Sequence, residues 1–564
     1  MNYDDRPWLA SYDSGIPADI AIPERTYTDL LLEGFSNDPG APAVVYMDKV
    51  LTHSDMEYYS RRFAAYLAAN RCGQGDVVAL HTPNLPAYLI GLAGALRAGC
   101  AVTGVSALLT KNELAYQLND SGAKVLVTWD VMFAEKVLPI QDEIPGVAEV
   151  LIAWAGDFLP SWKKFLGKVT GRIPSGRASA MRDKQVMYFS EAMTRYKAEV
   201  PRADISPDDT CLLMYTGGTT GRPKGTMLLH KNIVANIEQV KTWSEFKPGG
   251  EVMCSGFPFF HLAGLMFGMA TLATGNCQCL VPDPRDTDLI ARICEKYRPT
   301  LMANVPTLYK MLLDNPRFRE VNHERLRVCI SGAAPFAADD IRALESVVGG
   351  GKVLEVYGMT ETSPVITANP YMGQSRAGSV GLPLPCTRVR LMDLEEGRVQ
   401  VPRGEEGELV VNGPQVMAGY LNKPGETAHA LREVDGETWL YTGDIARMDE
   451  DGFFYIVDRA KDMLVVGGYK VFSREVEEHL YEHPAVEFCA IVGRPNPEKS
   501  GSEIVVAVIQ PSGAYADKDA ETLKGEIMAF ARERMAPYKV PRVVEFTGEM
   551  PLTNVGKVDK KALR

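Results

Sequence analysis

Short apolar runs alternate with helical segments over residues 26–356 of the 564-residue chain, and this alternation constrains the fold more than any other feature. Buried strands are predicted at residues 76–80, 123–128, 210–214, 252–254, 300–303, 327–330 and 353–356. Helices are predicted at residues 54–70, where apolar side chains recur at helical spacing, and at residues 85–98, which are rich in small residues. Alternating strands and helices predict an α/β fold in layers, built on a largely parallel sheet.

The rest of the chain changes pattern twice. Residues 378–455 contain valine-rich runs between glycine-containing turns, which predicts a small β subdomain. Charge is dense at residues 458–462, and about a hundred residues follow, the usual size of one small domain. We therefore expect an N-terminal domain of residues 1–459 and a C-terminal α+β domain of residues 460–564. In the latter, helices are predicted at 475–483 and 521–535 and strands at 488–492 and 504–509.

The stretch YTGGTTGRPKG at residues 215–225 follows the predicted strand 210–214 and is rich in glycine and threonine. Glycine permits positive φ and close approach of a ligand, and the amides of such a loop form a nest for anions. We expect the loop to hold phosphate oxygens through Thr216, Gly217, Gly218, Thr219, Thr220, Gly221 and Lys224. Pro223 before Lys224 excludes the P-loop motif, and the dinucleotide-binding spacing is lacking. A flexible surface loop between two strands is the alternative.

Two predicted strands end in polar, glycine-bearing turns. Residues 331–335 follow the strand 327–330, and residues 357–362 follow the strand 353–356. In open α/β sheets the ligand lies at the carboxyl ends of the strands. We therefore expect the ligand to lie at these two turns.

The composition excludes several classes of protein. A net charge of −12 argues against nucleic acid as the main partner. The ten cysteines form no C-x-x-C pair, so we expect reduced packing thiols in a cytoplasmic protein. The first residues lack a signal-peptide pattern, and the longest apolar stretch, residues 85–109, is too interrupted to span a bilayer. The oligomeric state stays open, a homodimer included.

Residues 157–184 are basic and contain interleaved aromatic residues. One interpretation is a surface patch that contacts a membrane peripherally. The other is a surface insertion whose aromatic residues cover part of the core. We favour the second, because Pro160, Gly167 and Gly171 interrupt any long amphipathic helix.

Six stretches resemble, in order, the motifs of the adenylate-forming superfamily of acyl-CoA synthetases, luciferases and peptide-synthetase adenylation domains. They are residues 215–225, 331–335, 357–364, 441–444, 452–462 and 551–557. Together with residues 62–67 and 117–122, they extend the resemblance over essentially the whole chain. It is closest to AMP-forming long- and medium-chain fatty acyl-CoA synthetases. The resemblance implies an acid–thiol ligase that uses ATP, Mg²⁺ and coenzyme A to convert a fatty acid into acyl-CoA through acyl-AMP.

The resemblance implies a role for each motif. Residues 215–225, called the phosphate loop below, would hold the β- and γ-phosphates, with Thr216 and Lys224 as catalytic residues. Glu361, together with Thr216, would bind Mg²⁺, and Thr360 would touch the α-phosphate. Tyr357 would stack on adenine, Asp444 would accept the ribose hydroxyls, and Arg459 would hold ribose or phosphate. Further nucleotide-binding positions are Gly332, Ala333, Ala334, Glu355, Gly358, Met359 and Ile456.

Lys557 corresponds to the adenylation lysine of the family, whose ammonium would bring the carboxylate and the α-phosphate together. Taken alone, a lysine near a C-terminus is usually just solvated. Lys461 stands at the hinge position, so rotation of a mobile C-terminal domain would exchange Lys557 for the strip Gly467, Gly468 and Tyr469. The two glycines would let the pantetheine of CoA pass, although a plain hairpin turn is the alternative.

Substrate specificity follows less directly from the motifs. Gly358 stands where acetate-specific relatives have tryptophan, so we expect an acyl pocket that is open to longer acids. Phe260 and residues 262–266 are candidates to line an apolar tunnel, and His261 matches a position beside the acyl carbon, although a lone histidine is more often structural. The residues before Trp439 depart from the usual fatty-acid signature, which leaves aryl and cyclic carboxylates open.

Three further functions stay open. An acyl- or aryl-AMP ligase would load a carrier protein instead of CoA, and a luciferase-like oxygenase would emit light from an acyl adenylate. A non-catalytic nucleotide-binding scaffold is disfavoured, because Lys224, Glu361, Asp444 and Lys557 are all present.

Overall fold

The computed structural model describes residues 2–170, 173–196, 203–216, 222–334, 336–373, 375–466, 469–497, 502–515, 518–552 and 558–564. The chain divides into two compact units. Unit 1 consists of residues 1–7, 389–411 and 432–564, and unit 2 consists of residues 8–388 and 412–431. The predicted domain boundary after Arg459 lies inside unit 1 and stays a prediction.

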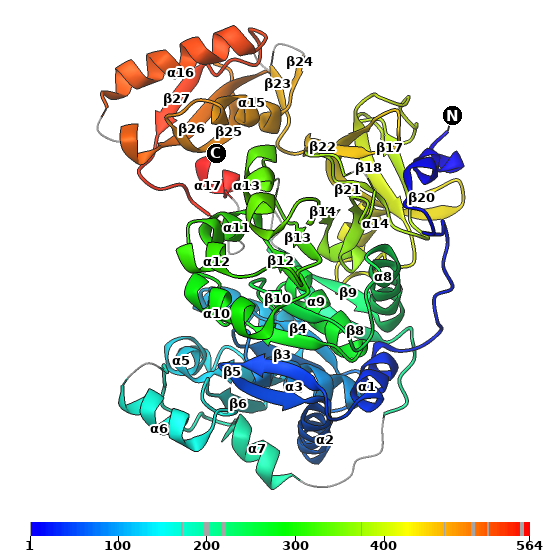
Figure 1. The fold of residues 1–564 in the computed structure, drawn as a ribbon, viewed down its shortest axis with the longest axis vertical. Helices are drawn as coiled ribbons and strands as arrows, with labels where there is room; N and C mark the ends of the chain where they lie inside the picture. Colours follow the sequence, from blue (N-terminus) through cyan, green and yellow to red (C-terminus); the bar gives the residue numbers. More distant parts are fainter. Residues whose placement is uncertain are drawn as a thin grey trace. The chain divides into compact units, whose positions relative to one another are not determined.

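Unit 2 contains two large sheets among the described residues, and most of their strands are parallel (Figure 1). The nine-stranded sheet has the order β16 (Leu382–Pro383), β15 (Val365–Ala368), β14 (Val353–Gly358), β13 (Val328–Ser331), β12 (Leu301–Asn304), β10 (Val252–Ser255), β11 (Cys277–Leu280), β1 (Pro42–Tyr46) and β2 (Lys49–Thr52). The eight-stranded sheet has the order β19 (Gly419–Tyr420), β9 (Lys224–Leu229), β8 (Thr210–Thr216), β4 (Ala101–Gly104), β3 (Val77–His81), β5 (Ala123–Trp129), β6 (Glu149–Ala153) and β7 (Gln185–Tyr188). The strands from β14 to β1 in the first sheet and from β8 to β7 in the second run parallel, which confirms the predicted fold class.

Helices join and cover these sheets. They are α1 (Tyr27–Asn37), α2 (His53–Ala69), α3 (Pro86–Arg97), α4 (Lys111–Asp120), α5 (Asp130–Met132), α6 (Ser161–Val169), α7 (Phe189–Arg195), α8 (His230–Trp243), α9 (Leu262–Ala273), α10 (Thr287–Tyr297), α11 (Pro306–Leu313), α12 (Pro316–Glu320), α13 (Ala338–Val348) and α14 (Pro424–Ala430). Helices α3 and α8 pack on the eight-stranded sheet, α9 packs on the nine-stranded sheet, and α8 also contacts α9. This helical layer therefore joins the two sheets.

Local sequence explains where several helices begin and how closely they pack. Thr26, Thr52 and Thr110 cap α1, α2 and α4, and each forms a capping box with the acidic residue three positions later. Helix α3 approaches α2 at Gly94, where an added Cβ atom would lie 2.8 Å from the Cβ of Phe63. The contact therefore depends on the missing side chain of Gly94.

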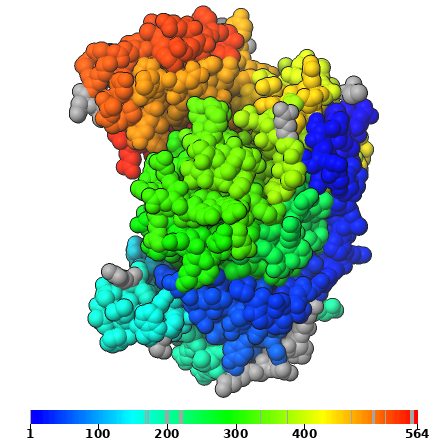
Figure 2. Space-filling model, viewed as in Figure 1, coloured from blue at the N-terminus to red at the C-terminus, as the bar shows by residue number. Residues whose placement is uncertain are grey.

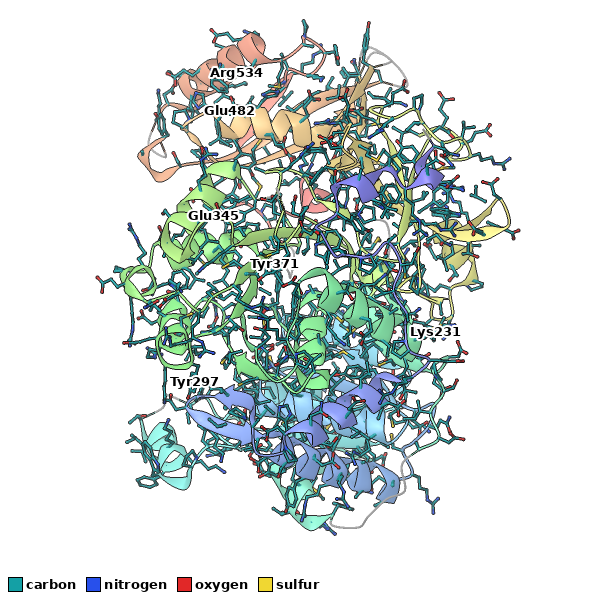
Figure 3. All side chains as sticks on the ribbon, turned by 45° about the vertical axis from the view of Figure 1, so that its right-hand side comes forward. Lys231, Tyr297, Glu345, Tyr371, Glu482 and Arg534 are labelled. Atoms are coloured by element: carbon teal, nitrogen blue, oxygen red, sulfur yellow. The ribbon has the colours of Figure 1, made fainter. Side chains whose placement is uncertain are left out.

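Unit 1 contains the smaller sheets. The five-stranded sheet consists of β17 (Arg388–Met392), β18 (Gly407–Asn412), β21 (Glu437–Met448), β20 (Leu431–Val434) and β22 (Phe454–Arg459). The C-terminal residues form the pair β23 (Leu464–Val466) and β24 (Tyr469–Val471), the sheet β25 (Val486–Pro495), β26 (Glu503–Pro511) and β27 (Val543–Phe546), and the helices α15 (Ser473–Tyr481), α16 (Ala520–Arg534) and α17 (Lys560–Leu563). Glu482 and Arg534, labelled in Figure 3, link the ends of α15 and α16 across 3.6 Å.

The structure bears on the cysteines, on membrane-spanning helices and on the predicted β subdomain. Nine of the ten cysteines are buried, as expected of packing residues. Across the described part of the chain, no helix combines the length and the apolar character that crossing a membrane requires. The expected β subdomain at 378–455 is confirmed in its five-stranded sheet, but β16 and β19 belong to the large sheets of unit 2.

Candidate active site

The predicted phosphate loop at residues 215–225 connects two antiparallel strands of unit 2. Tyr215 pairs with Gly225, and Thr216 pairs with Lys224, so the loop is the turn of the β8–β9 hairpin. The predicted strand before the loop is confirmed, and a strand rather than a helix follows it. Gly217, Gly218, Thr219, Thr220 and Gly221 lie outside the described residues. The hairpin fixes the positions of Thr216 and Lys224 at the two ends of the loop.

Lys224 is held by two neighbours from a distant part of the chain. Its Nζ lies 2.7 Å from Oε2 of Glu426, and it lies 4.5 Å from the ring centroid of Tyr420. The hydrogen bond from Lys224 lowers the pKa of the Glu426 carboxyl group. Glu426 belongs to α14, and its side chain is 54% exposed. The ammonium of Lys224 thus has an accessible carboxylate as its partner.

Glu361 lies in the short 3-10 helix Thr360–Thr362 and is 5% exposed. The hydroxyl of Tyr420 donates a hydrogen bond of 2.8 Å to its Oε1, and its backbone oxygen accepts one of 2.9 Å from Met417. Burial, and then the charge of Glu361, raise the pKa of Tyr420 well above its usual value. Tyr420 therefore links Lys224, over its ring, to Glu361, at its hydroxyl.

The carboxyl ends of β10, β12, β13 and β14 lie at one edge of the nine-stranded sheet, because these strands are parallel neighbours. β13 ends at Ser331, opposite Glu355 of β14, and the turn that follows begins with Gly332 and Ala333. Ala333 has a positive φ of 68°, and Ala333 and Ala334 are exposed. The two predicted turns therefore follow neighbouring strands at the same edge of the sheet. A non-glycine residue at positive φ is strained backbone of a kind that clusters at functional sites.

Gly358 ends β14, where that strand pairs with Val365 of β15. A Cβ atom on Gly358 would lie 1.9 Å from the carbonyl oxygen of Pro364. The missing side chain of Gly358 therefore makes room for the carbonyl group of Pro364. The expected reason for a glycine at this position, an open acyl pocket, is wrong. The role of Gly358 and of its neighbours Tyr357, Met359 and Thr360 beside the nucleotide stays a prediction.

The Gly358→Ala substitution should destabilise the protein. The added methyl group must displace the Pro364 carbonyl, and overpacking of this kind costs about 1–3 kcal/mol. We expect the midpoint of thermal unfolding to fall by several degrees. Gly350→Ala is the matched control, because a Cβ atom there meets nothing within 4 Å. Equal midpoints for the two variants would contradict this packing argument.

The expected acyl-tunnel residues lie at the start of α9. His261 precedes this helix, is partly exposed and has its ring centroid 5.0 Å from that of Phe260. A Cβ atom on Gly264 would lie 2.5 Å from the carbonyl oxygen of Pro258, so this glycine serves helix packing rather than open space. Ala263 is only partly buried, and it packs, as Val356 does, against the buried cluster that contains Phe257 and Phe267 beside the same edge of the sheet.

Unit 1 brings together a second group of predicted residues. Asp444 of β21 pairs with Arg459 of β22, and their side chains form an ion pair of 2.9 Å. Asp444 is 4% exposed, whereas the side chain of Arg459 is 49% exposed. Ile456 faces Ala446 in the same ladder. Burial, and then the charge of Arg459, lower the pKa of Lys461 to about 8.

Tyr469, at the start of β24, is 60% exposed and stacks on Tyr538 with a centroid distance of 4.6 Å. Val466 and Tyr469 pair across β23 and β24, so Gly467 and Gly468 connect two antiparallel strands. These two glycines and Lys557 lie outside the described residues. The structure thus brings the predicted residues together as two separate groups, one in each unit.

The donor set of unit 2 suits one hard cation. Across the described residues, no group of three or more His, Cys, Asp and Glu side chains could hold a metal ion. Glu361 offers a buried carboxylate, and Thr216 offers a hydroxyl oxygen. Mg²⁺ commonly takes one or two protein carboxylates and fills its other positions with water and phosphate oxygens. These residues therefore fit Mg²⁺ that arrives with a phosphate ligand.

The model of the AMP-binding enzyme family matches residues 33–421, and the model of the AMP-binding enzyme C-terminal domain matches residues 475–557. The chain belongs to the AMP-binding enzyme family. Its relatives include the long-chain-fatty-acid–CoA ligase of Bacillus subtilis (strain 168), which is 39% identical over 99% of this chain and 97% of that protein. The long-chain-fatty-acid–CoA ligase of Escherichia coli O6:H1 is 35% identical with the same coverage. A feruloyl-CoA synthase of Amycolatopsis sp is 36% identical over 93% of this chain and 96% of that protein.

Several solved structures share the fold of this chain. The crystal structure of ATP-bound MatB from Rhodopseudomonas palustris matches with a TM-score of 0.81 and 29% identity, over 96% of this chain and 98% of that one. An ATP-bound RpMatB-BxBclM chimera matches with the same TM-score and coverage at 30% identity. The fold of this AMP-binding enzyme is thus shared with proteins whose structures contain ATP.

Two site residues of this AMP-binding enzyme escaped the sequence analysis. Tyr420 and Glu426 lie about 200 positions from Lys224 along the chain, and no local pattern connects them with the phosphate loop. Their place follows from the pairing of Tyr420 in β19 with Thr226 in β9, which brings the segment beside the hairpin. Only this strand pairing, which the sequence does not show, would have pointed to Tyr420 and Glu426.

Proposed function

We propose that this AMP-binding enzyme is a long-chain-fatty-acid–CoA ligase that forms acyl-CoA, AMP and pyrophosphate from a fatty acid, ATP and CoA. The observation that carries the proposal is the linked set of Lys224, Tyr420 and Glu361 beside the phosphate loop. It combines a cation for phosphate with a buried carboxylate for Mg²⁺, in a chain that is similar along its whole length to long-chain-fatty-acid–CoA ligases.

In the first half-reaction a carboxylate oxygen attacks the α-phosphorus of ATP, and pyrophosphate leaves. Phosphoryl transfer needs positioning and charge neutralisation rather than covalent help. In our proposal the amides of the phosphate loop and Lys224 bind the β- and γ-phosphates, where negative charge grows as pyrophosphate departs. Thr360 contacts the α-phosphate, and Glu361 with Thr216 holds the Mg²⁺, which supplies further neutralisation of phosphate charge.

The remaining nucleotide contacts come from the two groups of residues described above, one in each unit. Tyr357 gives a flat face for adenine, next to the small residues Gly332, Ala333 and Ala334. Asp444 accepts hydrogen bonds from the ribose hydroxyls, and Arg459, now its ion-pair partner, can share that contact or turn to phosphate. Glu355, Gly358, Met359 and Ile456 complete the expected nucleotide site.

Lys557 acts in the first half-reaction by binding the acyl carboxylate and the α-phosphate together, because the two anions would otherwise repel each other. In the second half-reaction the CoA thiolate attacks the acyl carbon, and AMP leaves with the former carboxylate oxygen. We propose that a C-terminal domain of residues 460–564 turns at Lys461 between the steps. This movement replaces Lys557 with Gly467, Gly468 and Tyr469, beside which pantetheine passes. His261 lies beside the acyl carbon in this scheme.

A panel of acids tests the proposal. ATP- and CoA-dependent AMP release should be measured for acetate, octanoate, palmitate, oleate, benzoate and ferulate. We expect kcat/KM to be highest for the long-chain acids. The 36% identical feruloyl-CoA synthase makes an aryl acid the second candidate substrate, and a preference for ferulate would replace the fatty acid in the proposal. Release of pyrophosphate without AMP or acyl-CoA would instead favour transfer to a carrier protein, because the acyl group would then stay in acyl-AMP.

Glu426→Gln should lower the KM for ATP. Lys224 must exchange the Glu426 carboxylate for phosphate oxygens, so removal of that competing charge favours ATP. Exposed ion pairs contribute roughly 0.2–1 kcal/mol, so a decrease of up to about fivefold is expected, with kcat little changed. Steady-state kinetics with ATP as the varied substrate measure this.

Glu295→Gln is the matched control for Glu426→Gln. It removes the carboxylate of another exposed ion pair of unit 2, that with Arg317, and should leave the KM for ATP unchanged. An unchanged or higher KM in Glu426→Gln would show that Glu426 does not compete with phosphate for Lys224.

A further inference from the structure

Helix α6 presents apolar side chains to solvent. Trp162, Phe165, Leu166 and Val169 are 64%, 72%, 52% and 68% exposed. Their spacing of three, one and three positions places them along one face of the helix. A helix on the surface of a soluble domain ordinarily turns such a face towards the core. In α6 the apolar stripe points the other way.

The opposite face of α6 holds the helix on unit 2. Nζ of Lys163 donates a hydrogen bond of 2.9 Å to the backbone oxygen of Met47, and Nζ of Lys164 donates one of 2.6 Å to that of Asp157. Gly167 is buried, and a Cβ atom there would lie 2.3 Å from Cδ1 of Ile173. The two lysines and the glycine thus fix the helix with its apolar stripe outwards.

The interpretation of residues 157–184 as an insertion whose aromatic residues cover the core is therefore only partly right. Phe158 does cover the core, with ring centroids 5.3 Å from Tyr59 and 6.5 Å from Phe189. Trp162 and Phe165 are largely exposed instead. In Figure 1 α6 lies at the rim of unit 2 near α5 and α7, and Figure 2 shows this part of the chain as a projecting lobe in cyan.

The charge of the segment differs in sign from that of the chain. Residues 157–184 contain seven basic and two acidic residues, a net charge of +5, whereas the whole chain carries −12. Arg177 is exposed, and the side chain of Arg182 is 70% exposed and lies 3.4 Å from Asp142 in an exposed ion pair. Exposed tryptophan and phenylalanine beside arginine and lysine are the composition of helices that lie in the interface of anionic membranes.

We propose that α6 docks this enzyme on the surface of an anionic phospholipid bilayer, with Trp162, Phe165, Leu166 and Val169 entering the interface and exposed basic residues of the segment, such as Arg177, meeting lipid phosphates. The choice of a bilayer over a protein partner rests on the proposed function, because a long-chain acid concentrates in lipid. The stripe is short, so the contact is peripheral and reversible. It would bring the enzyme to the phase that contains its substrate.

The test uses the full chain without ATP, CoA or fatty acid, so it does not depend on catalysis. Binding to phosphatidylcholine vesicles with 30% phosphatidylglycerol is measured by co-sedimentation, and insertion is followed by quenching of Trp162 fluorescence with brominated lipid. Phe165→Ser with Leu166→Ser retains the tryptophan probe and should weaken binding at least tenfold. The control pair Leu108→Ser with Met372→Ser removes two side chains that are 61% and 72% exposed elsewhere, and should bind like the wild type.

Each outcome bears on the proposal. Loss of binding and of quenching in the α6 pair alone supports it. Absence of vesicle binding by the wild type, or equal binding by the α6 pair, overturns it. Equal binding to pure phosphatidylcholine vesicles would show that α6 does not require anionic lipid, which overturns the proposed anionic surface. A dimer in light scattering that dissociates in the α6 pair, without vesicle binding, assigns the stripe to a second copy of the chain. Activity on octanoate separates these results from a failure of the proposed function, because it should be equal in all variants.

Discussion

Replacing Lys557 by alanine is expected to slow acyl-AMP formation by about two to three orders of magnitude while sparing the second half-reaction. In the proposed site the ammonium of Lys557 holds two anions together in the transition state. One preorganised contact of this kind contributes roughly 3–4 kcal/mol. The thioester step from supplied acyl-AMP requires no such bridge. Pyrophosphate release and acyl-CoA formation from synthetic acyl-AMP measure the two steps separately.

Lys561→Ala is the control for this experiment. Lys561 is an exposed lysine four positions further along the chain, and its loss should leave both steps unchanged. If Lys557→Ala slowed the two half-reactions equally, Lys557 would not be the adenylation lysine.

Replacing Lys461 by proline is expected to abolish acyl-CoA formation while leaving one turnover of pyrophosphate release. Lys461 lies in a turn in which the amides of Asp462 and Met463 both donate to the backbone oxygen of Arg459, at 2.9 and 3.0 Å. A hinge works through its backbone dihedral angles, and proline fixes φ near −65°. The substitution should therefore hold the C-terminal residues in one orientation.

The comparison with Lys461→Ala isolates the backbone effect. Alanine removes the partly buried ammonium but retains backbone freedom, so this variant should turn over at a rate close to that of the wild type. A burst of pyrophosphate, followed with and without CoA, distinguishes the variants, and circular dichroism checks that both are folded. Thioester formation by Lys461→Pro at the wild-type rate would place the hinge elsewhere.

The predicted strands are confirmed where apolar runs were continuous. β8 and β14 extend the runs at 210–214 and 353–356 by two residues each, and β13 is shifted by one residue from the run at 327–330. These runs are recognisable because a buried parallel strand needs apolar side chains on both faces. The order of strands in the two large sheets had no such local signal. β9 and β19, nearly 200 residues apart, pair only because the folded chain returns to the same edge.

Glycine was the residue type whose role the sequence misjudged. Gly358 was expected to leave an acyl pocket open, whereas a backbone carbonyl fills the place of its side chain, as one does at Gly264 among the candidate tunnel residues. A glycine in a sequence does not distinguish room for a ligand from close approach of backbone. Periodicity had a similar limit in α6, since an apolar stripe has the same pattern whether it faces the core or solvent.

The contacts of Lys224 and Glu361 show what a motif leaves out. The phosphate loop and the Thr360–Thr362 turn were both recognisable in the sequence, but their connection through Tyr420 was not. Tyr420 contacts the ammonium of Lys224 with the face of its ring and the carboxylate of Glu361 with its hydroxyl. Only the tertiary structure brings these three residues together.

In the proposed reaction the chain activates a fatty acid by transfer of AMP to its carboxylate. A long-chain acid labelled with ¹⁸O in its carboxylate, incubated with the enzyme, unlabelled ATP, Mg²⁺ and CoA, tests this most directly through the mass of the nucleotide product. We predict AMP that carries one ¹⁸O atom, in amounts equal to the acyl-CoA formed. Label in inorganic phosphate together with ADP, or acyl-CoA formed with unlabelled AMP, would contradict the account.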